Sequence, residues 1–270
     1  MLAPDLSPSD GARRLAAELL QRAAPPPTDR SAGAQLLTNA AAAAAASATR
    51  VTQAAQPASP GGLVASLLSA RGCLTLARGV WSDALRPGDI AVDATCGNGN
   101  DAAELATILA RRASEAPASS AVGRLVALDI QPAALDATRA RLDDALRDFG
   151  AAERPHVELL LHDHASFPPS LAPGSVRLVV YNLGYLPHGD HSRTTTAEGT
   201  VRSLQAATEL LCVGGMITAV SYPAHPEGVR EAAAVHDAFA RLDKHRWRVL
   251  VCRPSQNERE KFLTVALRRC

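Results

Sequence analysis

Two glycines and two carboxylates follow a short apolar stretch near residue 90. The segment reads Asp93-Ala-Thr-Cys-Gly97-Asn-Gly99-Asn-Asp101, comes directly after Asp89-Ile-Ala-Val and leads into Ala- and Leu-rich sequence. A glycine lets the backbone approach a ligand where a Cβ would collide, and the first turn of a helix presents unpaired N–H groups. The pattern predicts a strand, a cofactor-binding turn and a helix over about 101–112.

The residues of this turn discriminate between two kinds of cofactor. Folds that bind dinucleotides hold a pyrophosphate with a G-x-G-x-x-G run, whereas Ala102 stands here in place of the third glycine. Asp93 would repel a pyrophosphate but suits a cation, and S-adenosylmethionine (SAM) carries a sulfonium and an ammonium group. Since Leu125-Val-Ala-Leu-Asp129 ends a second strand in an acid, we expect SAM. The alternative is an ordinary strand-to-helix turn that uses glycine for geometry only.

The composition limits the classes of partner. Of the 270 residues, 28 are Lys or Arg and 27 are Asp or Glu, so an RNA partner would need a local basic patch. The 5 cysteines form no C-x-x-C pair and are typical of reduced intracellular thiols. No apolar run approaches the ~18–20 residues of a membrane span. We therefore expect a soluble protein with no membrane partner.

Residues 1–60 differ in composition from the rest of the chain. They contain Pro25-Pro26-Pro27, an alanine run over 40–46 and few large apolar side chains. Such a segment cannot bury enough surface to offset its ordering entropy, so we expect a disordered low-complexity extension. Arg13 and Arg14, next to an Ala/Leu stretch, favour a transit segment for a chloroplast or another organelle. Several acids argue instead for a plain extension of a cytoplasmic protein.

From residue 61 onward, short apolar stretches alternate with helical patterns. This order implies a mostly parallel sheet with helices on both faces, and no helix separates the last two strands. We expect an α/β, Rossmann-like class I methyltransferase domain over 61–270, with a seven-stranded mostly parallel sheet and an antiparallel last strand. The expected strands are 89–93, 124–129, 156–161, 176–181, 216–221, 246–253 and 262–268, and the expected helices are 63–85, 101–112, one from Pro132, 196–212 and 227–242.

Polar side chains stand where four of these strands end, which is where open sheets bind ligands; they are Asp93, Asp129, Asp163 and Asn182. Asp129 can accept hydrogen bonds from both ribose hydroxyls of a nucleoside, and Gln131 can add a contact. Asp163 is suited to meet the adenine amino group. Although two histidines flank Asp163, no cysteine or further histidine lies near in sequence, so we expect no metal.

The segment Tyr181-Asn182-Leu-Gly-Tyr185-Leu-Pro187 suggests an amine as the methyl acceptor. The side-chain carbonyl of Asn182 and a backbone carbonyl can accept hydrogen bonds from the N–H groups of an amine, which directs its lone pair at a methyl donor. Tyr185 would then pack against a flat or cationic substrate. A turn that uses asparagine and glycine for backbone reasons is the alternative.

The motifs together resemble the bacterial putative rRNA methylase family over about residues 70–270. They are Asp93-Ala-Thr-x-Gly-Asn-Gly-x-Asp101, Asp129-Ile-Gln131, Asn182-Leu-Gly-Tyr-Leu-Pro187, Gly189-Asp190, the 194–200 run, and Tyr222-Pro-x-His225-x-Glu-Gly228 followed by Glu231. The resemblance implies methylation of the aminomethyl group of a tRNA wobble thiouridine. His188 and Pro226 depart from the family pattern, which affects the substrate pocket rather than the cofactor site.

The expected site residues fall into two groups. An aminomethyl group must lose a proton before it attacks, and Asp190, His191 and His225 are the candidate acceptors. With Asn182 and Tyr185 they form the expected catalytic group. The expected SAM-binding group is Asp93, Thr95, Gly97, Asn98, Gly99, Asp101, Asp129, Gln131, Asp163 and Asn182.

We thus expect a SAM-dependent N-methyltransferase that acts on RNA, in particular on a tRNA. Its basic patch would be made of Arg193, Arg253, Arg259 and Lys261, each of which can equally be solvated surface. The rival readings are a class I methyltransferase of a small amine and a non-catalytic RNA-binding module. Intact acids and glycines in the cofactor motif argue against the last of these.

Overall fold

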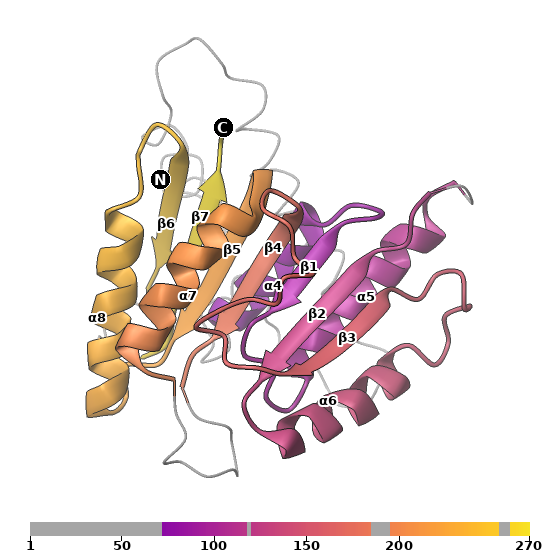
Figure 1. Cartoon of the computed structure of the whole chain (residues 1–270), viewed down its shortest axis with the longest axis horizontal. Coiled ribbons are helices and arrows are strands. Elements are labelled where there is room, and N and C mark those ends of the chain that lie inside the picture. Colours follow the sequence, from indigo (N-terminus) through magenta and orange to yellow (C-terminus); the bar gives the residue numbers. More distant parts are fainter. Residues whose placement is uncertain (1–71, 118–119, 185–194, 254–259) are drawn as a thin grey trace, which may run out of the picture.

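The computed structural model describes residues 72–270 apart from 118–119, 185–194 and 254–259. Its strands form one sheet in the order β3-β2-β1-β4-β5-β7-β6 (Figure 1). Every neighbouring pair is parallel except those of β7, which is antiparallel to β5 and β6. The expected seven-stranded sheet and antiparallel last strand are confirmed. The strands are β1 (Ile90–Asp93), β2 (Arg124–Asp129), β3 (His156–Leu161), β4 (Val176–Asn182), β5 (Leu211–Ser221), β6 (Trp247–Cys252) and β7 (Phe262–Arg268).

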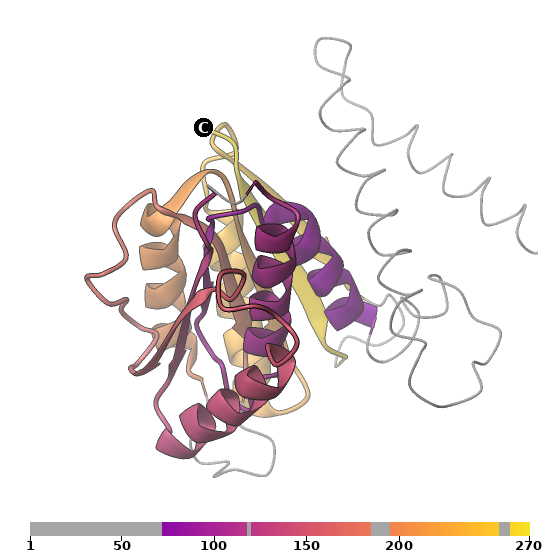
Figure 2. The same cartoon turned by 90° about the vertical axis from the view of Figure 1, so that its right-hand side faces the viewer.

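Helices cover the sheet on both faces, as Figure 2 shows. One layer contains α4 (Gly72–Ala84), α5 (Asn100–Ser114) and α6 (Pro132–Ala145), and the other contains α7 (Ala197–Leu210) and α8 (Pro226–Ala240). The two core clusters are built mainly of Leu, Val and Ala, as the aromatic-poor sequence requires. An exception is Trp81 of α4, which is buried and donates a hydrogen bond from Nε1 to Thr218 Oγ1 at 2.8 Å.

The junction between α7 and β5 differs from the prediction. The helix ends at Leu210 rather than at Cys212, and the strand begins at Leu211 rather than at Met216. Gly214 has φ +77°, a left-handed conformation that glycine adopts without strain. The pairing of β4 with β5 shifts register at this point, between Val176 and Leu178. The two glycines at 214–215 therefore mark an irregularity inside a long strand rather than a loop before a short one.

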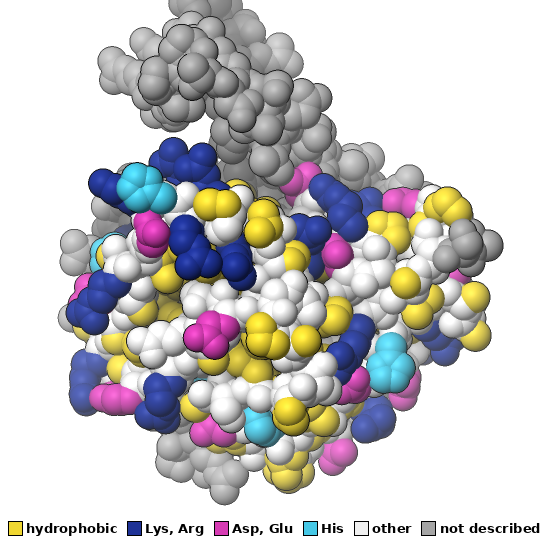
Figure 3. All heavy atoms as spheres, turned by 45° about the horizontal axis from the view of Figure 1, so that its top comes forward, with side chains coloured by type: hydrophobic (Ala, Val, Ile, Leu, Met, Phe, Trp, Pro, Cys, Tyr) yellow, Lys and Arg dark blue, Asp and Glu magenta, His cyan; other side chains and the backbone are white. Residues whose placement is uncertain are grey.

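The visible surface carries both signs of charge. In Figure 3, dark blue basic and magenta acidic side chains are interspersed over the face turned to the viewer, as expected from 28 basic and 27 acidic residues. Among the helices of the described residues, none is long and apolar enough to cross a membrane. The extension expected over 1–60 lies outside the described part of the chain.

Candidate active site

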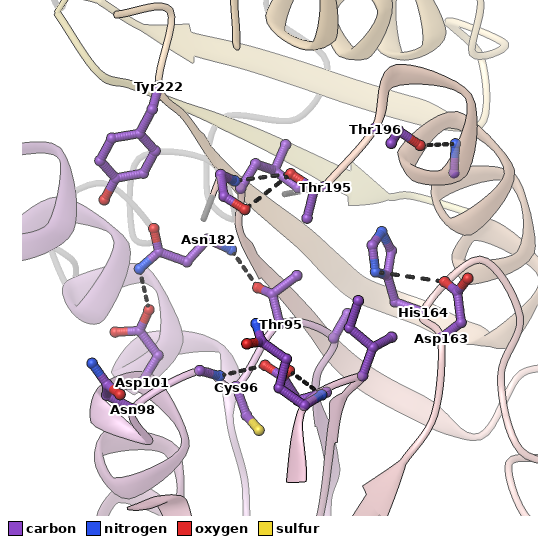
Figure 4. A pocket seen from close by; sticks show the side chains of 18 of the residues that line it. Thr95, Cys96, Asn98, Asp101, Asp163, His164, Asn182, Thr195, Thr196 and Tyr222 are labelled. Carbon is purple, nitrogen blue, oxygen red and sulfur yellow. Dashed lines mark hydrogen bonds and ion pairs between the residues drawn. The ribbon is translucent and has the colours of Figure 1, made fainter. Parts of the chain in front are cut away.

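A cavity of about 570 Å³ opens at the carboxyl ends of the parallel strands, within the range typical of small-molecule sites. The loops after β1, β2, β3, β4 and β5 form it, and Figure 4 shows the side chains that line it. The predicted residues that line it are Thr95, Gly97, Asn98, Asp101, Asp129, Gln131, Asp163, Asn182 and His225. Asp93 and Gly99 are buried behind this lining, and Tyr185, Asp190 and His191 lie outside the described residues.

The two glycines of the turn serve different purposes. Gly97 has φ +49°, and its N–H donates to Asp129 Oδ2 at 3.0 Å, which ties the turn to the end of β2. Gly99 has φ +76°, and a Cβ there would lie 2.6 Å from the Cα of Thr138 in α6. The second glycine is therefore required by the packing of α6 against the turn. The sequence offers the approach of a ligand and the geometry of the turn as reasons for these glycines, and packing against α6 is a further reason at Gly99.

Asp93 is a fully buried carboxyl group directly behind the turn. Its Oδ1 accepts a hydrogen bond from the Thr95 N–H at 3.1 Å, while Oδ2 has no hydrogen-bond partner among the described residues. Burial, and then the neighbouring Asp101, raise the pKa of this carboxyl well above its usual range. The charge of Asp93 would be stabilised by a cation in the cavity, which would lower that pKa again.

Asn182 is held by two bonds at the end of β4. Its backbone N–H donates to Thr95 Oγ1 at 2.8 Å, and its Nδ2 donates to Asp101 Oδ2 at 2.9 Å. Burial raises the pKa of Asp101, while the Asn182 bond and the guanidinium of Arg78, 3.8 Å away, lower it. Because a carboxylate only accepts hydrogen bonds, the amide turns its NH2 toward Asp101. Its carbonyl oxygen points away from Asp101, on the side of Tyr222 (Figure 4).

The other end of the cavity lies at the ends of β2 and β3. Asp129 accepts from the Gln131 N–H at 2.9 Å in addition to Gly97, so each carboxylate oxygen keeps a further lone pair for a ligand. The side chain of Asp163 is 68% exposed, and its Oδ1 accepts from the Ala165 N–H at 2.8 Å. Burial lowers the pKa of the adjacent His164, whose ring meets Tyr181 edge-on. In the described part of the chain no group of three or more His, Cys, Asp or Glu could hold a metal ion.

Glu231 of α8 anchors the chain that follows Asn182. It is 3% exposed, and its two carboxylate oxygens accept from Thr195 Oγ1 at 2.8 Å and from Thr200 Oγ1 at 2.6 Å. Thr195 in turn accepts from the Gly184 N–H at 2.9 Å. Both ends of the segment between Gly184 and Thr195 are thereby tied to one buried acid. Sequence reasoning noted Glu231 within a motif but gave it no role; an acid at a core position of a predicted helix was the available signal.

Tyr222 lines the cavity beside Asn182, on the side that we call the acceptor side, and was also missed as a site residue. Its half-buried ring lines the cavity beside Asn182, and burial raises the pKa of its hydroxyl. The Nζ of Lys261 lies 5.6 Å from the centre of the Tyr222 ring, and the guanidinium of Arg253 lies 4.0 Å from that of Phe262. The available signal was an aromatic residue directly after a predicted strand in an aromatic-poor chain.

The fold and this cavity define a class I SAM-dependent methyltransferase. Within that class, the chain belongs to the family described as Putative rRNA methylase, whose sequence model matches residues 125–268. The resemblance stated from the motifs is thereby confirmed.

Individual relatives agree with this assignment. A chloroplastic tRNA (mnm(5)s(2)U34)-methyltransferase of Arabidopsis thaliana is 36% identical over 161 residues, 59% of this chain and 56% of the relative. The chain thus spans about half the length of that curated protein. A crystal structure described as a putative rRNA-methylase from Clostridium thermocellum is 32% identical, with a TM-score of 0.58, and covers 73% of this chain and 97% of its own. A methyltransferase from Streptococcus mutans in complex with SAH is 25% identical, with the same shares covered and a TM-score of 0.57.

Proposed function

We propose that this protein transfers the methyl group of SAM to an amine of RNA, namely the aminomethyl group of a tRNA wobble uridine. The observation that carries the proposal is the fixed amide of Asn182, whose carbonyl oxygen is directed away from Asp101 within the cavity. A hydrogen-bond acceptor in a strand-end pocket suits a substrate that has N–H groups. The name of the Arabidopsis relative, a tRNA (mnm(5)s(2)U34)-methyltransferase, supports the same acceptor.

The cavity residues fit SAM better than a dinucleotide. Asp129 offers acceptor lone pairs to ribose hydroxyls, and Asp163 stands exposed at the same end for the adenine amino group. Behind the turn that follows β1, Asp93 is a buried carboxyl with an oxygen that lacks a partner among the described residues, which suits a cationic neighbour. We assign the remaining lining residues of the turn, Thr95 and Asn98, to shaping this cradle.

When bound, SAM supplies an already activated methyl group, so the chain mainly has to align the acceptor within ~3–3.5 Å. Asn182 aligns the acceptor by accepting a hydrogen bond from an N–H of the amine, which directs the lone pair of the nitrogen away from Asn182. Thr95 and Asp101 restrain the backbone and the amide of Asn182. Glu231 restrains the following segment through Thr195.

His225 is better suited to capping a helix than to removing a proton. Its Nδ1 accepts from the Gly228 N–H at 3.1 Å at the start of α8. In the neutral ring the proton therefore resides on Nε2, which cannot also accept one. Of the three predicted acceptors of the amine proton, we assign the role to Asp190 or His191.

Methyl transfer from labelled SAM tests the proposal. The purified protein is incubated with tRNA that carries the aminomethyl group, with the same tRNA lacking it, and with small amines, and nucleosides are identified by mass spectrometry. We expect label only in the aminomethyl nucleoside, and a large loss of rate with Asn182→Ala. Label only in small amines would favour a metabolite enzyme, and SAM or tRNA binding without transfer would favour a binding module.

We further propose an organellar location, since the Arabidopsis relative is described as chloroplastic. A fusion of residues 1–71 to a fluorescent protein, compared with residues 72–270, tests this. Import of the first fusion and cytoplasmic retention of the second are expected, and cytoplasmic retention of both would contradict the proposal.

A further inference from the structure

We infer that Arg253 and Lys261, beside the ring of Tyr222, form a docking edge for the phosphate backbone of the RNA substrate. This docking edge, defined by those two cations, rests on the proposed function. Arg253 directly follows β6 and Lys261 directly precedes β7. Because Cys252 pairs with Leu263 across these antiparallel strands, the two cations come from the same corner of the sheet.

Both cations are held by aromatic rings. The guanidinium of Arg253 lies 4.0 Å from the centre of the Phe262 ring, and Lys261 Nζ lies 5.6 Å from the centre of the Tyr222 ring, each within the ~6 Å range of a cation–π interaction. A guanidinium stacked by its face keeps its N–H groups free at the edge, where a phosphate binds in a bidentate manner. The rings therefore reduce the entropy that these side chains would lose on binding RNA.

The docking edge lies on the acceptor side of the cavity. Tyr222, whose ring contacts Lys261, lines the cavity together with Asn182 at the ends of β5 and β4, whereas Asp129 and Asp163 line it at the ends of β2 and β3, on the other side of β1; Figure 4 shows Tyr222 and Asp163 on opposite sides. A nucleotide whose base reaches Asn182 would bring its own or a neighbouring phosphate toward Tyr222. Cations at this corner thus meet the backbone of the nucleotide that is modified.

Charge at this corner favours an anion. Arg253, which is exposed, and Lys261, which is half-buried, outnumber Glu260, the half-buried acid next to Lys261 in the chain. The Asp101 carboxylate, also close to Tyr222, is paired with Arg78 at 3.8 Å. A chain of net charge +1 has no global attraction for RNA, so a local pair of cations has to supply it.

Salt-dependent binding of full-length, aminomethyl-bearing tRNA tests the inference. Each phosphate contact to a single strand contributes about 0.7 to the slope of log K against log salt, which corresponds to about fivefold in affinity at 0.1 M salt. We expect Arg253→Gln and Lys261→Gln each to weaken tRNA binding about fivefold and to lower the slope by about that increment. The double variant should lose both increments, and the loss should appear in KM for tRNA.

Two variants make the comparison specific. Arg248→Gln removes an exposed cation from the other half of β6 and should leave binding and slope unchanged. Arg253→Lys keeps the charge and should keep the slope even if Arg253→Gln folds poorly, and circular dichroism monitors folding. Unchanged slopes in Arg253→Gln and Lys261→Gln, or an equal effect of Arg248→Gln, would overturn the inference while tRNA methylation stands. A wild-type protein that neither binds nor methylates tRNA would overturn both the inference and the proposed function.

Discussion

Replacing Asp101 should disturb the orientation of the Asn182 amide and leave the binding of SAM nearly unchanged. In the wild type the carboxylate accepts from Asn182 Nδ2 at 2.9 Å, so only one orientation of the amide satisfies both groups. In Asp101→Asn the new amide can donate as well as accept, and Asn182 can then present either its carbonyl or its NH2 to the substrate. Asp101→Ala removes the partner altogether and leaves Nδ2 without an acceptor.

The size of the effect follows from the kind of hydrogen bond. A bond to a charged group contributes about 1.5–3 kcal/mol and a neutral one about 0.5–1.5 kcal/mol, and Asp101 is only 7% exposed, so solvent weakens the bond little. The difference of about 1–1.5 kcal/mol predicts a fall of about fivefold to tenfold in kcat for Asp101→Asn. Loss of the whole bond in Asp101→Ala predicts about 10-fold to 150-fold.

Single-turnover methyl transfer at saturating SAM, together with calorimetric titration of SAM, separates two roles for this residue. An orienting role predicts a slower transfer step with little change in the Kd for SAM. A direct cofactor-binding role, which the sequence alone suggested, predicts a weaker Kd and an unchanged rate once SAM is saturating. The second outcome would refute the reasoning from the Asn182 bond. Thr107→Ala, on the same helix, removes a local bond to the Ala103 carbonyl; it is the matched control and should alter neither quantity.

Three further substitutions test the packing around the site. Gly99→Ala should lower the free energy of unfolding by about 2–4 kcal/mol, because its Cβ would lie 2.6 Å from the Thr138 Cα at a positive φ; a wild-type urea midpoint would contradict this. Burial raises the pKa of Glu231 above its usual 4.5, so this acid's contribution to stability is full below pH 4.5 and is lost as the pH rises through the higher folded pKa. Glu231→Gln should therefore gain thermal stability relative to wild type as the pH rises above 4.5, until Glu231 of the folded wild type has lost its proton, and a gap that stays constant with pH would exclude this titration. Trp81→Phe should cost about 1–3 kcal/mol in urea unfolding, because it leaves the buried Thr218 hydroxyl without its donor, whereas the Trp81→Phe, Thr218→Val double variant should recover part of that loss.

The sequence by itself determined the elements and the edge of the sheet at which the chemistry occurs. Apolar stretches that end in Asp93, Asp129 or Asn182 are local patterns, and strand ends are set by the residues next to them. Pro132 likewise begins α6 where its ring fits the first turn. Elements set by local patterns of this kind can be predicted from the sequence because they depend on neighbouring residues. The prediction of the α7–β5 junction was wrong because its glycines fit a loop as well as an irregular strand.

Only the tertiary structure decided which polar groups restrain one another. Asp101 and Asn182 are 81 positions apart in the chain, and Thr195 and Glu231 are 36 apart. Their pairing depends on the order of the strands and on the packing of α5 and α8, which no short pattern contains. The need for glycine at position 99 also arises from α6, a helix that follows later in the sequence. Contacts between distant segments depend on how whole elements pack, and for that reason the sequence located this site but did not assign the roles within it.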